Sequence, residues 1–141
     1  MEINFLVLLV GGVASLVLGM IWYGKALFGD AYMRALGADM NMSPEKMKEI
    51  QKKMWQLLLT QFVLTMFQVW VLAVYINSSI TVITPMANSL WIWAGFVMPT
   101  IAGSALWSAR PRKDAWKIFF ITSGYNLVLF ILFAVILKAW M

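Results

Sequence analysis

The sequence predicts an all-α integral membrane protein, a four-helix transmembrane bundle, and three observations lead to this prediction. No Asp, Glu, Lys or Arg occurs between residues 54 and 109, and two further uncharged runs, 3–24 and 118–137, flank that block. A helix needs ~20 mostly apolar residues to cross a hydrocarbon core of ~30 Å, so each flanking run accommodates one span and the central block two. The composition agrees, because 62% of the residues are hydrophobic and only 12% are charged, against about 25% charged in soluble domains.

The four spans use most of the 141 residues, so we expect one transmembrane domain over residues 1–141. The expected spans are about 3–24, 54–76, 86–109 and 117–140, and the expected cytoplasmic loops are 25–53 and 110–116.

The first span is expected to begin at Asn4 or Glu2 and to run to about residue 24. In the segment that follows, Asp30 is expected to cap a short helix that Gly37 ends, since Asp is a good N-cap and Gly a good C-terminal stop. This short helix is either an interfacial helix in the headgroup layer or a part of the loop.

The later spans carry their own start signals. Ser43 followed by Pro44 predicts a helix that begins in the cytoplasm, as a helical extension of the second span. Thr84 followed by Pro85 predicts the start of the third span, and Asp114 is expected to cap the fourth.

The basic residues indicate an orientation. Every Lys and Arg except Lys138 falls in residues 25–53 or 110–117, on one side of the predicted bundle. By the positive-inside rule this side is cytoplasmic, so both termini face outward and the protein lies in the cell (inner) membrane. The net charge of +5 sits beside membrane spans and not on a soluble groove, so we expect the lipid bilayer, and no nucleic acid, as a partner.

The residue types available exclude several kinds of chemistry. The chain has no Cys and no His, so thiolate metal sites and the commonest ligands of haem, zinc and copper are missing. No ionisable Asp, Glu, Lys or Arg lies inside a span, which argues against a proton relay or a counter-ion for a charged substrate. We therefore expect no cofactor, no metal site and no catalytic residue, and a protein that is not an enzyme.

Polar side chains inside the second and fourth spans are the candidate functional residues. They are Gln61, Thr65, Gln68 and Tyr75 on one stripe of the second span, and Ser123 and Asn126 on the fourth. Two readings are open. They form an inter-helix hydrogen-bond network worth ~0.6 kcal/mol for each bond, or they line a small polar cavity between the second, third and fourth spans, where Pro99 would free a backbone carbonyl.

Small residues recur at four-residue spacing on the first and third spans, which predicts close helix packing there. They are Gly11, Ser15 and Gly19 on the first span, and Gly95, Pro99 and Gly103 on the third. The two patterns superpose at a constant offset, so the bundle is either a pair of parallel-repeat helical hairpins or a pair of unrelated ones. Trp22 and Trp107 near one boundary, and Trp93 near the other, fit interfacial aromatic belts.

The stretch GMIWYGKALFGDAY at residues 19–32 resembles the Gly-x-x-Trp-Tyr…Phe-Gly-x-x-Trp segment of an uncharacterised family of small bacterial four-helix membrane proteins, classed as a domain of unknown function. WAGFV at 93–97, Arg110-Pro111 and KIFFI at 117–121 resemble the third and fourth helices of that family in the same order. Tyr32 stands where the family usually has Trp, and residues 108–109 replace a usual Phe-Glu. The resemblance implies the fold and a membrane location, with no established activity or ligand.

Two classes of function follow. The first is a non-enzymatic membrane component that associates with itself, as a homo-oligomer, or serves as an accessory subunit of a membrane complex through its small-residue faces. The alternative is a channel, a facilitator or a lipid-binding protein for a small uncharged solute or a lipid.

The orientation can be tested by labelling. A single Cys at Ser79, in the expected outer turn, should react with an impermeant reagent added outside intact cells, because no native Cys competes. A Cys at Lys48 should react only after the membrane is opened. If the two positions exchange behaviour, the predicted orientation is inverted.

Overall fold

The structure, a computed structural model, describes residues 4–38, 41–78 and 84–140. All of its regular elements in these ranges are helical, and they are α1 (Phe5–Trp22), α2 (Gly29–Ala35), α3 (Pro44–Ser78), α4 (Pro85–Ile92), the π-helix η1 (Trp93–Val97), α5 (Met98–Leu106) and α6 (Arg112–Trp140). Four helical rods, with α4, η1 and α5 forming one of them, are long and apolar enough to cross a membrane, which confirms the predicted architecture. The second rod begins at Pro44, as the predicted extension requires.

Local capping chemistry explains three of the four rod starts. The side chains of Asn4 and Thr84 accept hydrogen bonds from backbone N–H groups of the first turn at 3.0 and 3.2 Å. Ser43 accepts one at 3.4 Å in front of Pro44. Each of these residues supplies an acceptor to an N–H that has no partner within its helix, so the predicted starts at these residues are confirmed.

The two predicted Asp caps are wrong, because both Asp residues lie inside their helices. The N-cap of α2 is Phe28, and Asp30 lies within the first turn. Likewise α6 begins at Arg112, and Asp114 lies within its first turn, where its N–H donates to the carbonyl of Pro111. In the first turn an acidic side chain favours the helix through the macrodipole, so it marks a helix start without being the cap.

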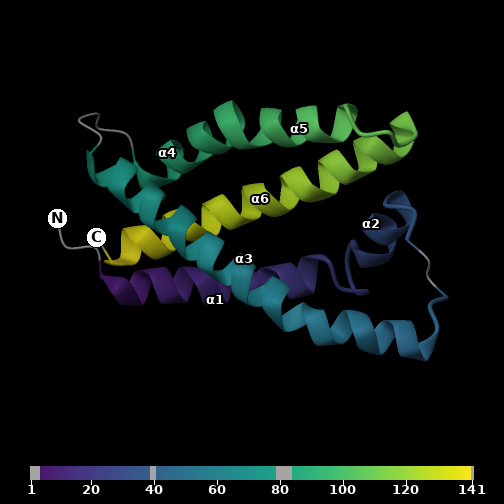
Figure 1. Ribbon diagram of the computed structural model, residues 1–141. Coiled ribbons are helices and arrows are strands. Elements are labelled where there is room, and N and C mark those ends of the chain that lie inside the picture. The colour runs from purple at the N-terminus through teal and green to yellow at the C-terminus, as the bar shows by residue number, and fades with distance from the viewer. Residues whose placement is uncertain (1–3, 39–40, 79–83, 141) are drawn as a thin grey trace.

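The rods form two antiparallel hairpins, α1 with α3 and the α4–α5 rod with α6 (Figure 1). The helix α6 lies between α1 and the α4–α5 rod and also contacts α2, whereas α3 crosses in front and packs mainly along α1. The first turn of α1 and the last turn of α6 lie at the same end, as an even number of spans requires. Following the predicted topology, we call this end outer and the opposite end inner.

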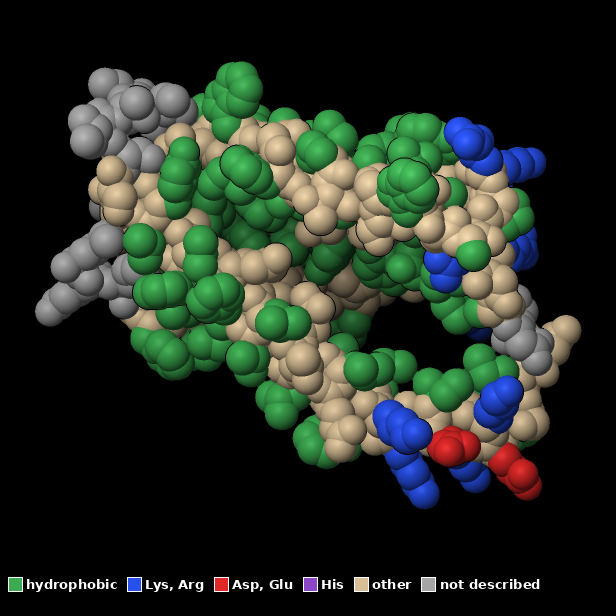
Figure 2. Space-filling view, turned by 45° about the horizontal axis from the view of Figure 1, so that its top comes forward, with side chains coloured by type: hydrophobic (Ala, Val, Ile, Leu, Met, Phe, Trp, Pro, Cys, Tyr) green, Lys and Arg blue, Asp and Glu red, His purple; other side chains and the backbone are tan. Residues whose placement is uncertain are grey.

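The core occupies the outer half of the molecule, where α1, α3 and α6 meet. Its most completely buried large side chains are those of Val69, Leu129, Phe133 and Leu137. By contrast, every residue from Ser43 to Gln61 is exposed, so the inner half of α3 stands away from the bundle. Lys and Arg side chains gather at the inner end on the face shown in Figure 2. The predicted outer turn, including Ser79, lies outside the described residues.

The small residues of α1 face another helix. A Cβ added at Gly11 would lie 2.8 Å from a methyl carbon of Val69, and one added at Gly12 would lie 2.5 Å from the ring of Phe62. Ser15 is only 1% exposed, and Gly19 faces the ring of Tyr125 at ordinary contact distance. The absence of side chains thus lets the outer half of α3 approach α1 closely.

The corresponding prediction for the third rod is wrong within this chain. A Cβ at Gly95 or Gly103 would meet no atom within 4 Å, and Pro99 is exposed. Periodicity shows which residues share a helix face, but it does not show whether another helix covers that face. The equivalence of the two hairpins stays a prediction.

The two stripes provide a matched test of packing. Gly11→Leu should lower the free energy of unfolding by about 1–3 kcal/mol, because the larger side chain displaces the buried Val69. Gly103→Leu makes the same chemical change in open space and should leave it nearly unchanged. The measurement is unfolding in detergent, at a dilution that keeps the protein monomeric. Equal losses for the two variants would contradict the packing described.

Candidate functional site

Inside the spans the polar side chains available to bind a ligand are uncharged, because 3–24, 54–109 and 118–137 contain no Asp, Glu, Lys or Arg. In the part of the chain that the structure describes, no group of three or more His, Cys, Asp or Glu side chains is placed to hold a metal ion. The candidate site is therefore sought where amide and hydroxyl groups face a cavity.

A cavity of about 690 Å³ lies between α1, α3 and α6 toward the inner end, with one wall residue from α2. The opening beside the charged first turns of α3 in Figure 2 separates this part of α3 from the rest of the molecule. We call the 690 Å³ cavity the polar cavity. Its polar wall residues are Ser15, Tyr23, Tyr32, Gln61, Gln68, Thr122, Tyr125 and Asn126. Its volume falls within the roughly 300–1,000 Å³ that is typical of ligand pockets.

The shape of the polar cavity follows from the unequal packing of α3. Glycines hold its outer half against α1, as described above, while its inner half contacts no other helix closely and is exposed throughout. Since a 35-residue helix is a stiff rod, tight contact at one end and none at the other opens a wedge between α3 and α6.

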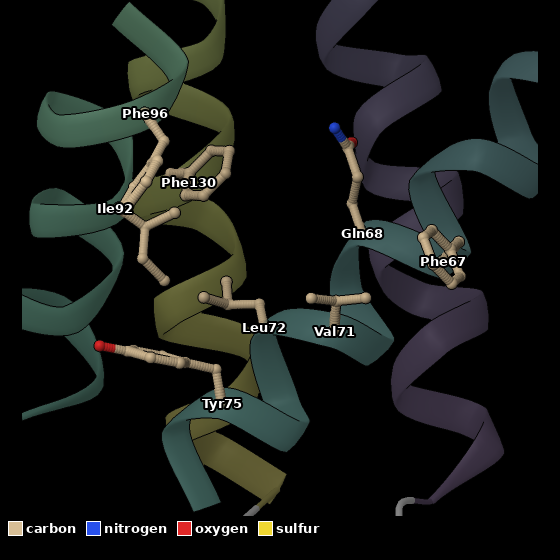
Figure 3. Close-up of a pocket in the computed structure, with 8 residues that line it drawn as sticks. All are labelled: Phe67, Gln68, Val71, Leu72, Tyr75, Ile92, Phe96 and Phe130. Carbon is tan, nitrogen blue, oxygen red and sulfur yellow. The ribbon is translucent and has the colours of Figure 1, made fainter. Parts of the chain in front are cut away.

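A second space, which we call the apolar pocket, adjoins the polar cavity at Gln68 and lies toward the outer end. Figure 3 shows the residues that line it. The pocket has a volume of about 340 Å³ and is bounded by α3, α4, η1 and α6. Its lining residues are Phe67, Gln68, Val71, Leu72, Tyr75, Ile92, Phe96 and Phe130. All but Gln68 and Tyr75 are fully hydrocarbon, so this pocket suits an alkyl chain.

Gln68 is the residue that borders both spaces. In Figure 3 its side chain extends away from Leu72 and Tyr75, so that the amide lies at the edge of the apolar pocket. The side chain is exposed, and no hydrogen bond joins its amide to another described residue. In a membrane an amide without a partner is costly, which makes this position suited to a polar group of a bound molecule.

The structure brings together only part of the predicted polar set. Gln61, Gln68 and Asn126 share the polar cavity. Thr65 is fully buried and accepts a hydrogen bond from Gln61 at 3.2 Å, and the amide of Asn126 donates to the Thr122 carbonyl at 2.9 Å. Both bonds stay within one helix, so these two do not join helices as the predicted network requires.

Three of the six predicted residues do not line the polar cavity, and the buried Thr65 is one of them. Tyr75 lines the apolar pocket, and Ser123 is 5% exposed and lines neither space. The predicted partner helix also differs, because α1 walls the polar cavity and the third rod borders only the apolar pocket.

Pro99 does not supply a carbonyl to the polar cavity. It is exposed and lies two residues after the end of the π-helix η1, where the N–H of Met98 donates to the carbonyl of Trp93, five residues back. A proline has no N–H and crowds the carbonyl four residues earlier, and a wider π turn accommodates both effects.

Two Trp residues read as belt residues instead join helices. The indole N–H of Trp22 donates to the carbonyl of Ile121 at 3.0 Å, and that of Trp93 donates to the carbonyl of Ser123 at 3.2 Å. Gly124 directly follows Ser123, and a Cβ there would approach the Trp22 ring to 3.1 Å. One turn of α6 is thus bonded from α1 on one side and from η1 on the other.

Sequence reasoning missed several residues of the polar cavity. Tyr125 donates its hydroxyl hydrogen to the Ser15 carbonyl at 3.2 Å, and the Tyr23 ring centre lies 4.9 Å from that of Tyr32 and 5.3 Å from that of Tyr125. A signal for Tyr125 existed, since it adjoins the predicted site residue Asn126. No local signal places Tyr32 here, because its position depends on how the segment between α1 and α3 folds back.

These features define a four-span helical membrane protein with an open, uncharged cavity. Residues 6–138 match a protein family described as a protein of unknown function (DUF1761), and the chain belongs to this family. No curated protein and no solved structure matches the chain.

Proposed function

We propose that this protein binds a lipid-like amphiphile within the membrane. An uncharged polar group of the ligand occupies the polar cavity, and an alkyl chain occupies the apolar pocket. The observation that carries the proposal is the position of Gln68, whose amide stands between the two spaces and has no hydrogen-bond partner among the described residues.

The wall chemistry supports an uncharged polar group. The polar cavity offers amide, hydroxyl and phenol groups and no charged side chain. A charged group at this depth would lose its hydration without gaining a counter-ion, whereas a hydroxyl or ester exchanges hydrogen bonds with Gln61, Gln68 or Asn126.

The outer half of the bundle favours binding over conduction. Beyond Gln68 the polar lining gives way to the apolar pocket and to the packed core around Val69 and Phe133. A channel or facilitator for a polar solute would need polar groups along the whole path, so a ligand that is itself half apolar fits better. The proposed role involves no chemical reaction.

Self-association or an accessory role in a complex is the second candidate. The stripe of Gly95, Pro99 and Gly103 supports it, because no atom lies within 4 Å of a Cβ added at either glycine and small residues permit close approach by another helix. The two proposals use different faces of the molecule and are compatible.

The proposed binding can be tested with a diacylglycerol that carries a diazirine near the end of one acyl chain. Irradiation in phosphatidylethanolamine vesicles should label peptides that contain residues of the apolar pocket. Gln68→Leu should reduce this labelling about fivefold, the cost of one hydrogen bond. The thermal unfolding of this variant should match that of the wild type, because the amide has no partner to lose.

Gln56→Leu is the matched control, since Gln56 is an exposed amide on the same helix and lines neither space. Its labelling should equal that of the wild type. The proposal fails if labelling spreads evenly over the exposed faces of α3, or if the two Gln variants behave alike. Oligomer size measured on the same samples reports on the second candidate.

A further inference from the structure

A separate cavity of about 500 Å³ lies at the inner end of the molecule, where α5 turns into α6. It is lined by Leu106, Trp107, Arg110, Arg112 and Ala115, none of which borders the polar cavity or the apolar pocket. The proline in this turn, Pro111, separates the two Arg residues and stands directly before α6, and both Arg residues line the one cavity.

The positive charge of this cavity is not balanced nearby. Neither Arg110 nor Arg112 forms an ion pair with another described residue, and both are exposed. The nearest carboxylate in the sequence, that of Asp114, is in the first turn of α6 but does not line the cavity. Two guanidinium groups on one wall match the oxygens of a phosphate group, which they can bind through paired hydrogen bonds.

The remaining walls indicate where the rest of such a ligand lies. Trp107 is 93% exposed and Leu106 is 43% exposed, so an aromatic ring and an alkyl side chain both face outward beside the arginines. Trp is favoured at the level of lipid headgroups, and leucine is favoured among acyl chains. Toward the inner end the cavity wall changes from the apolar Leu106 and Trp107 to the basic Arg110 and Arg112. A phospholipid has its acyl chains and its phosphate in the same order.

We propose that this cavity is a phosphate-binding site for the headgroup of an anionic phospholipid. Arg110 and Arg112 bind the phosphate oxygens, and Trp107 and Leu106 contact the glycerol and the upper acyl chain. The site is independent of the binding proposed above, because it lies on a different face and uses no residue of the polar cavity or the apolar pocket.

The test is binding of phosphatidylglycerol to the full chain in uncharged detergent, measured by native mass spectrometry during a lipid titration. Replacing both arginines, Arg110→Gln with Arg112→Gln, should weaken binding about tenfold for each guanidinium removed. The conservative pair Arg110→Lys with Arg112→Lys keeps the charge but loses the paired geometry, so it should give an intermediate loss. Unchanged binding in the Gln pair would overturn the proposal.

The matched control is Lys113→Gln with Lys117→Gln. It removes the same amount of charge from the same end of the molecule, but neither lysine lines the cavity. Binding by this control within a few-fold of the wild type supports a local site at the arginines. A loss equal to that of the arginine pair would show that the basic end attracts lipid diffusely, and it would overturn the proposal. Thermal unfolding of each variant identifies any loss of binding that comes from misfolding. If the Arg→Gln pair misfolds, the pair Arg110→Lys with Arg112→Lys is used in its place, and unchanged binding in that pair overturns the proposal.

A second arm separates a lipid from a soluble source of phosphate. Inorganic phosphate and glycerol phosphate are added as competitors during the same titration. If neither displaces phosphatidylglycerol at millimolar concentration, the acyl contacts are part of the site, as proposed. Displacement by inorganic phosphate with lipid-like affinity would assign the arginines to a free phosphate and overturn the lipid assignment.

Discussion

The helix α6 is the element on which the rest of the structure depends. It packs against α1, α2 and the rod formed by α4, η1 and α5, and its carbonyls at Ile121 and Ser123 accept the indole hydrogens of Trp22 and Trp93. In a bilayer, burial of apolar surface does little to hold helices together, because lipid is as apolar as leucine. Directional bonds and close packing around one turn of α6 therefore fix the neighbouring helices in place.

The position of α3 is set mainly by its contacts with α1. The missing side chains of Gly11 and Gly12 let α3 lie against α1 in the outer half, and Val69 and Leu72 complete the core there. Toward the inner end no comparable contact exists, so α3 diverges and the polar cavity opens beside Asn126. The polar cavity thus begins where the close glycine contacts between α1 and α3 end. Gln68 lies at this boundary between the packed core and the open space.

The sequence was sufficient for the number of spans and for most helix starts, because those depend on local properties. An uncharged run of adequate length and an Asn4, Ser43 or Thr84 cap act within a few residues of themselves. The stripe formed by Gln61, Gln68 and Tyr75 was recognisable as well. Its surroundings were not, because the buried face of α3 that carries Val69 and Ile76 is turned roughly a quarter of a turn from it.

Contacts between distant helices set the features that sequence reasoning missed. The stripes of Gly11 on α1 and Gly103 on α5 have the same spacing, yet one faces Val69 and the other faces open space. Similarly, Trp22 and Trp107 both precede basic segments, but Trp22 bonds to α6 while Trp107 is 93% exposed. The residue type and its place in the pattern are alike for both members of each pair, so the arrangement of the helices is what distinguishes them.

The central claim is that the side of α6 facing α3 stays open at the level of Asn126, while the same helix is closed at Phe133. Collision accessibility of a nitroxide label attached at single Cys residues in bilayers tests this directly, since the chain has no native Cys. A label at position 126 should be reached by dissolved oxygen well above the level found for a label at position 133, whose native side chain has no exposed surface. Equal protection of the two labels would show a closed bundle and contradict the account.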